Sequence, residues 1–139
     1  MSIASFRVKH PRPRKLSDPY HDFSAKMLEE LLALPDDKLK AHHYVQLLGP
    51  TLPAGTYKES VYFLPVAFRH LLALTPDDYT LELIRSIIGF VAINTSWLEK
   101  DRILDTVRGC IQECFDHWTN QFIVVHRRSG NDEQNRTSP

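Results

Sequence analysis

The sequence predicts an all-α fold, a single-domain bundle of about five helices. Apolar residues recur at helical spacing through most of residues 18–126, and proline or glycine separates the successive apolar segments. Nearly the same phrase also occurs twice, as LLALPDD at residues 31–37 and LLALTPDD at residues 71–78. Each copy is typical of a helix end, a proline stop and a pair of carboxylates that begin the next helix.

The repeated phrase is compatible with two kinds of helical bundle. Antiparallel hairpins of an ordinary bundle produce such junctions, and HEAT-like repeats do so as well. Repeat proteins need about three stacked copies for stability, and two copies of the phrase are present. An ordinary bundle is therefore the favoured interpretation, and the repeat is kept as the alternative.

A basic arm and a polar tail flank the predicted helical domain, residues 18–126. The arm, residues 1–17, carries five basic residues and no acidic one, with prolines at positions 11 and 13. It is expected to be extended and flexible. The tail, residues 127–139, has no apolar residue, so it has nothing to bury and is expected to be disordered.

Two helices are predicted between the arm and the loop that begins at Gly49. The first begins near Asp18, ends at Leu34 and has an apolar stripe of Phe23, Met27, Leu31 and Leu34. The second follows Pro35, and its inward residues are Ala41, Tyr44, Val45 and Leu48.

The third predicted helix opens with a capping box and contains a proline. The side chains of Thr56 and Glu59 can satisfy each other's backbone amides at its start. Pro65 lies inside this segment, which runs to Leu74, so a kink near residues 61–65 is expected.

The last two predicted helices are the most apolar. The fourth begins at Thr75 and is apolar around most of its circumference through Ile93, which predicts a central, buried position. The fifth opens with a second capping box at Ser96 and Glu99. Its apolar stripe consists of Ile103, Leu104, Val107, Cys110, Ile111, Cys114, Phe115, Trp118, Phe122 and Val125.

The composition favours a cytoplasmic protein without a membrane span. Two cysteines four residues apart do not suggest a disulfide scaffold, and residues 1–17 lack the apolar core of a signal peptide. The uncharged apolar run at residues 86–98 has 13 residues, whereas a helix that spans a bilayer needs about 20.

The net charge of zero hides an uneven distribution. Residues 18–126 hold nine Lys/Arg against fifteen Asp/Glu and carry −6, while the arm carries +5 and the tail +1. An acidic domain favours a basic protein partner and repels nucleic acid. The arm either docks on its own domain or contacts the phosphates of nucleic acid or a membrane surface. Those phosphate contacts would come from Arg7, Lys9, Arg12, Arg14 and Lys15.

Three residues of the fifth predicted helix form a weak candidate for metal or thiol chemistry. Cys110, Cys114 and His117 share one helix, but zinc requires four ligands, and both cysteines fall on the apolar stripe. Nearby carboxylates should also raise the pKa of a nucleophilic thiol. A buried core pair is the favoured interpretation. No phosphate-binding or hydrolase motif is present, and no cofactor is expected.

An aromatic cluster on the third predicted helix is the strongest candidate for a binding site. The side opposite the core stripe carries Tyr62, Phe63, Val66 and His70. These residues are either covered by other helices or form an exposed patch that binds a partner. In the second case an acidic rim would come from Asp101, Asp105, Glu113 and Asp116.

Residues 59–68, ESVYFLPVAF, resemble the Tyr-aromatic-Leu-Pro segment of a group of small bacterial all-helical proteins, some of which are similar to toxin-immunity proteins. The resemblance implies a non-enzymatic protein, and the acidic charge of the domain adds the expectation that it neutralises a basic toxin by direct binding. Such a protein-binding module is the leading functional expectation. An adaptor that contacts nucleic acid or a membrane surface through the arm is the second, and a metal- or cysteine-dependent enzyme is the third.

Overall fold

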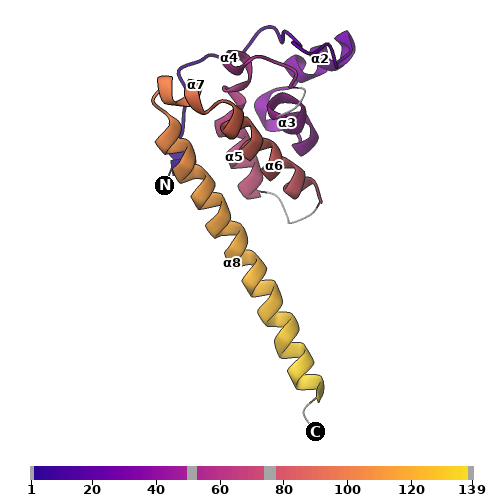
Figure 1. The fold of residues 1–139 in the computed structure, drawn as a ribbon. Helices are drawn as coiled ribbons and strands as arrows, with labels where there is room; N and C mark the ends of the chain where they lie inside the picture. The colour runs from indigo at the N-terminus through magenta and orange to yellow at the C-terminus, as the bar shows by residue number, and fades with distance from the viewer. Residues whose placement is uncertain (1, 50–52, 74–77, 138–139) are drawn as a thin grey trace.

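The computed structural model describes residues 2–49, 53–73 and 78–137, and describes side chains as far as residue 120. The described chain is all-α, as predicted, with eight α-helices and one 3-10 turn (Figure 1). In chain order these are α1 Ser2–Ser5, α2 Ala25–Ala33, η1 Asp36–Lys38, α3 Ala41–Leu48, α4 Tyr57–Ser60, α5 Phe63–Ala73, α6 Asp78–Ile93, α7 Thr95–Lys100 and α8 Leu104–Thr137. The predicted helix start at Thr75 lies outside the described residues.

The central helix of the bundle is α5, which packs against α1, α3, α6 and α8. Its buried residues are Phe63, Leu64, Pro65, Ala67, Phe68 and Leu71. The sequence assigns the central position to the fourth predicted helix, and that prediction is wrong. The corresponding helix, α6, buries one face with Leu83, Ile87 and Phe90, whereas Leu81 and Ile93 are exposed. Its main neighbours are α3 and α5, so much of its apolar surface is left uncovered.

The N-terminal arm is docked on the helical domain. Helix α1 lies against α8 and α5, and the arm buries Ile3, Phe6 and Leu16 in the core. The Glu113 carboxylate accepts a hydrogen bond from the Ile3 amide at 2.9 Å. The structure therefore differs from the flexible arm that charge and proline content predict, because three well-spaced apolar side chains favour docking.

The first two predicted helices are shorter than expected. Helix α2 begins after Ser24, whose hydroxyl accepts from the Met27 amide at 3.2 Å. Residues 18–23 form a turn instead, because Asp18 has a positive φ of 44° and its carboxylate accepts from the amides of residues 22 and 23. In place of the second helix, η1 and α3 are separated by extended backbone at Leu39 and Lys40.

The kink predicted for the third helix is confirmed as a break between α4 and α5. Residues 61 and 62 form a turn, and Pro65 explains it because proline lacks the N–H that would bond to the carbonyl four residues earlier. The capping box at the start of α4 is also confirmed. The Glu59 carboxylate accepts from the Thr56 amide at 2.9 Å.

The fifth predicted helix is divided into α7 and α8. The division lies at Arg102, which has a positive φ of 59°. Helix α7 begins at Thr95, so Ser96 is not its cap. The side chains of Asn94 and Thr95 instead bond to carbonyls of the last turn of α6.

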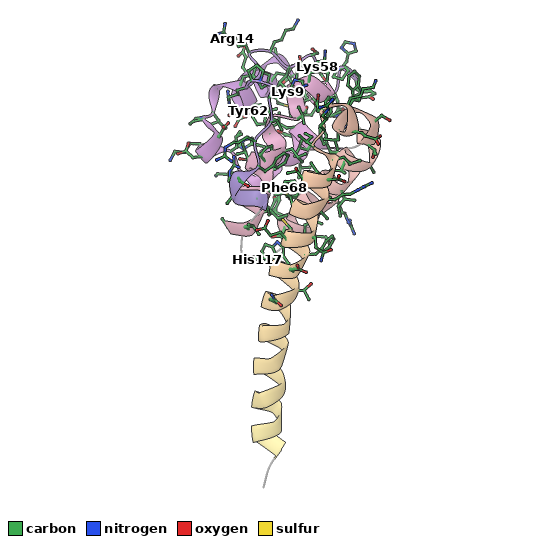
Figure 2. All side chains as sticks on the ribbon, turned by 90° about the vertical axis from the view of Figure 1, so that its left-hand side faces the viewer. Lys9, Arg14, Lys58, Tyr62, Phe68 and His117 are labelled. Atoms are coloured by element: carbon green, nitrogen blue, oxygen red, sulfur yellow. The ribbon has the colours of Figure 1, made fainter. Side chains whose placement is uncertain are left out.

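Helix α8 has 34 residues, a length of about 51 Å, and it projects well beyond the other helices (Figures 1 and 2). It includes residues 127–137, where the sequence predicts a disordered tail. Adding residues to a helix that is already formed costs little, even where nothing packs against them. None of the described helices is both long and apolar enough to cross a membrane.

Candidate functional site

The aromatic cluster predicted on α5 is covered. Phe63 is fully buried, and the Arg12 guanidinium lies 5.5 Å from the centroid of its ring. The Tyr62 hydroxyl donates to the Asp36 carboxylate at 2.5 Å, and Val66 and His70 are half-buried. Of the two interpretations of this cluster, coverage by the arm and η1 is the one found in the structure.

Two residues of the predicted acidic rim hold the arm in place. Asp101 accepts from the Tyr57 hydroxyl at 2.6 Å and from His10 Nε2 at 2.8 Å, and Lys9 Nζ is 3.4 Å away. Burial raises the pKa of Asp101, but these hydrogen bonds outweigh burial and hold the pKa below its ordinary value. Glu113 holds the start of the arm through the Ile3 amide.

The other two rim residues are exposed on α8. An Asp105 carboxylate oxygen is 3.6 Å from Arg108, and Asp116 accepts from the Gln112 amide group at 2.9 Å. Both contacts stay within α8 and are open to water, so they contribute little to stability. These two carboxylates are available to a partner.

The basic residues of the arm differ in what they contact. Lys9 pairs with Asp101, and Arg12 donates to Asp36 and to two carbonyls at the end of α2. Arg7 donates to carbonyls of the arm itself. Arg14 and Lys15 are exposed, and Figure 2 places Arg14 at the end of the molecule away from the projecting helix. Phosphate contact by all five residues would require the arm to leave the domain.

The cysteines of α8 are part of the core. Burial, with a smaller contribution from the charge of Glu113, raises the pKa of Cys110 to about 11 and that of Cys114 to about 12. Such thiols are protonated at neutral pH, whereas nucleophiles and metal ligands are thiolates. Within the described part of the chain, no group of three or more His, Cys, Asp or Glu residues could hold a metal ion, His117 included.

A polar recess lies beside the covered aromatic cluster. Its lining consists of Asp36, Asp37, Tyr44, Val66, Arg69 and His70. Asp36 is engaged by Arg12 and Tyr62, and Arg69 donates to the Phe6 carbonyl at 3.3 Å. Burial lowers the pKa of His70, so the ring is neutral at pH 7. These contacts connect the arm, η1 and α5. The residues of the recess therefore hold these three segments together.

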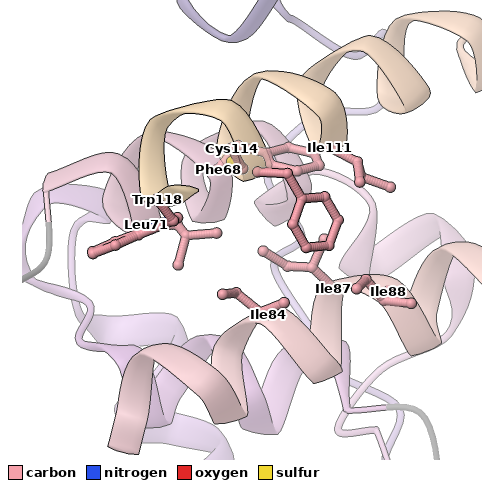
Figure 3. Close-up of a pocket in the computed structure, with 9 residues that line it drawn as sticks. Phe68, Leu71, Ile84, Ile87, Ile88, Ile111, Cys114 and Trp118 are labelled. Atoms are coloured by element: carbon pink, nitrogen blue, oxygen red, sulfur yellow. The ribbon is translucent and has the colours of Figure 1, made fainter. Parts of the chain in front are cut away.

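An apolar groove between α6 and α8 has the properties of a binding surface (Figure 3). Ile84 and Ile88 of α6 form one wall, and the other comes from α8 with Ile111, Phe115 and Trp118. The floor consists of Phe68 and Leu71 of α5 together with Ile87 and Cys114. In Figure 3 the two walls face each other across the floor.

Both walls of the apolar groove have the spacing of a helix face. The α8 residues lie at positions i, i+4 and i+7, and Leu81 extends the α6 wall to the same length of about 10 Å. Exposure is high for such large apolar side chains, at 51% for Leu81, 40% for Ile88 and 47% for Phe115. Contiguous apolar exposure of this kind marks interaction sites on soluble proteins.

The size of the apolar groove limits what it can bind. Its enclosed volume is about 20 Å³, little more than a water molecule, whereas small-molecule sites usually have about 300–1,000 Å³. The lining offers almost no polar group to orient a metabolite. The groove therefore has no room for a cofactor or substrate, but its exposed walls can pack against apolar side chains of another protein.

The sequence predicts a buried position for the groove residues of α6 and α8. The signal that points to the groove is the excess of apolar residues: α6 is apolar on most sides, and the α8 stripe continues beyond Cys114. The core of so small a domain cannot cover both the apolar surface of α6 and the full apolar stripe of α8. That excess, more than the aromatic cluster on α5, indicates an interaction surface.

Comparison with protein-family models, curated proteins and solved structures found no match to this chain.

Proposed function

We propose that this chain is a non-enzymatic, cytoplasmic protein-binding module that receives an amphipathic helix of a partner protein in the apolar groove. The observation that carries the proposal is the pair of facing apolar stripes on α6 and α8, joined by an apolar floor on α5. A helix laid between them would place its i, i+3 or i+4, and i+7 side chains against both walls, which is a common mode of peptide recognition.

The energetics favour moderate, reversible binding. Each large apolar side chain that leaves water contributes about 1.5–3 kcal/mol. Three anchors on the partner, together with the exposed parts of Leu81, Ile88 and Phe115, give a gross gain on the order of 10 kcal/mol. Association costs about 4–15 kcal/mol in lost freedom of motion. Tight binding would therefore require further polar contacts at the rim of the groove.

A toxin with a basic surface is the narrower proposal for the partner. It rests on the resemblance of residues 59–68 to proteins similar to immunity proteins and on the acidic charge of the domain. Because Tyr62 and Phe63 are engaged or buried, the apolar groove replaces them as the anchor site. Asp105 and Asp116, which are exposed elsewhere on α8, supply acidic positions on the same helix.

The docked arm supports protein binding over a nucleic-acid or membrane adaptor. Lys9 and Arg12 already pair with carboxylates of the domain. The raised pKa values of Cys110 and Cys114 likewise give no support to an enzyme that uses a thiolate.

Capture of partners by matched variants tests the proposed groove. Ile88→Asp places a charge on the groove wall, and Ile93→Asp places the same charge at an exposed isoleucine of the same helix that does not line the groove. Because both positions are exposed, both variants should fold, which circular dichroism can verify. Wild type and Ile93→Asp should retain a stoichiometric protein partner at low salt, and Ile88→Asp should lose it.

Two results would overturn the proposal. The first is the absence of any stoichiometric partner from the native host. The second is a partner that binds wild type and Ile88→Asp equally well. If a partner is identified, calorimetry with the purified protein should give one site per chain.

A further inference from the structure

The geometry points to a second copy of this chain as an occupant of the apolar groove. This inference rests on the proposed function, in that the groove binds a helix, and it names the helix: the projecting part of α8. Two copies would pair about a two-fold axis, each placing its projecting α8 in the groove of the other.

The projecting part of α8 is the first support for this inference. Among the described residues, the main elements that pack against α8 are α1, α5 and α7, and they lie along its first half (Figure 1). Among the side chains that the structure describes, Trp118 is the last of α8 to line the groove, and the helix continues to Thr137, about 28 Å further. This part of α8 therefore extends past the helices that pack against its first half.

The sequence of this part of α8 is apolar where it leaves the domain. Residues 122–125 are Phe-Ile-Val-Val, and Phe122 and Val125 follow Trp118 at i+4 and i+7. They continue the spacing of the groove wall on α8. A run of four large apolar residues on a lone helix is typical of a segment that another protein surface covers.

In a dimer with two-fold symmetry, the groove of each copy is filled and the apolar segment of each copy is covered. The groove walls and the apolar run at residues 118–125 each span seven residue steps, about 10 Å, so the two lengths match. Because groove and segment lie next to each other on one chain, the same rotation fills both grooves. The assembly therefore closes as a dimer and does not propagate as a filament.

The mass of the full chain in solution tests the inference. Sedimentation equilibrium over a range of concentrations should give twice the monomer mass for wild type. Ile88→Asp in the groove and Val125→Asp in the projecting helix should each halve this mass, and Ile93→Asp should leave it unchanged. An equimolar mixture of Ile88→Asp and Val125→Asp should recover part of the dimer, because one intact groove and one intact helix meet in the mixed pair.

A fluorescence signal reports on the groove itself. In a Trp97→Phe background Trp118 is the remaining tryptophan, and its emission should shift to shorter wavelength as concentration rises and the groove is covered. The shift should be absent when Ile88→Asp is added to that background.

Three outcomes would overturn the dimer. They are a wild-type chain that stays monomeric up to its solubility limit, a dimer that survives Ile88→Asp, and a mixture of the two variants that stays monomeric. Failure of the proposed function is distinguishable. A monomeric chain that still binds a different protein through Ile88 would overturn the dimer alone. If Ile88→Asp changed neither the dimer nor the capture of a partner, both the dimer and the proposed function would be overturned.

Discussion

His42 and His43 are neighbours in the sequence with opposite surroundings. His43 is buried, and its Nδ1 accepts from the Lys40 amide at 2.9 Å at the start of α3, whereas His42 is exposed. Burial first, and then the nearby charge of His42, lower the pKa of His43 against the opposing effect of Glu30. The His43 ring therefore stays neutral at a pH where an exposed histidine is protonated.

A pH dependence of stability follows from His43. The unfolded chain takes up a proton near pH 6.5 that the folded ring resists, so this stabilisation is fully present above that pH and is lost as pH falls below it. The free energy of unfolding should decrease between pH 7.5 and 5.5. His43→Gln should reduce the decrease, leaving a part from His70, whose pKa burial lowers in the same direction.

Urea unfolding at the two pH values measures this effect, and His42→Gln is the control. The control should keep most of the decrease found in wild type, because it removes only the smaller effect of the His42 charge and leaves the His43 ring buried. Equal decreases in all three proteins would contradict the assignment to His43.

Asp101 shows that charge alone does not identify a partner-binding site. The sequence presents it as one of several acidic residues on α7 and α8, suited to a partner's basic surface. In the structure its partners are Lys9, His10 and Tyr57, which are more than forty positions away. A carboxylate can pair with a group of its own chain or stay available to a partner protein. Which of the two occurs depends on tertiary contacts, and the spacing of residues in the sequence does not predict those contacts.

At the scale of the element, α6 separates its buried face from its groove face. Leu83 is fully buried, and Leu81 is half-exposed two positions earlier on the same helix. Leu83→Ala should lower the free energy of unfolding by about 2–5 kcal/mol, because it leaves a cavity in the core. Leu81→Ala should change it by no more than about 0.5 kcal/mol, as expected of a surface position.

Urea unfolding of both variants at one low protein concentration tests this division of α6. The low concentration limits any contribution from self-association through the apolar groove. If the two variants lost the same stability, α6 would be buried on both sides, as its sequence alone suggests.

Helix breaks were predictable where a residue forces them. Pro65 predicts the break between α4 and α5, because its effect acts four residues back along the same chain. The division between α7 and α8 lies at Arg102, a residue with no strong turn preference that adopts a positive φ. Packing of α8 against α5 and α1 accompanies that conformation, and local sequence gives no signal for it.

At the scale of the whole molecule, the arm supports the apolar groove from behind. Phe6 of the arm lies 6.2 Å, between ring centroids, from Phe68, which forms part of the groove floor. Ile3 joins the arm to α8 through Glu113. The arm therefore belongs to the core, and removing its anchors should loosen the floor of the groove.

Phe6→Ala tests the docking of the arm. Loss of this buried ring should lower the free energy of unfolding by about 3–5 kcal/mol. Arg14→Ala, an exposed position of the same arm, should be close to neutral. Chemical denaturation measures both, and a neutral effect of Phe6→Ala would indicate an arm that does not pack on the domain.

Local sequence accounts for the helical class, the capping box of Thr56 and Glu59, the break near Pro65 and the buried stripe at the start of α8. Each depends on residues within about one or two helical turns, where spacing and backbone chemistry act directly. Tertiary structure alone decided which helix is central, that the arm is docked, and which apolar residues remain exposed. Burial depends on where distant segments come to lie, so the same stripe of isoleucine and phenylalanine is core when a neighbour covers it and a groove when none does.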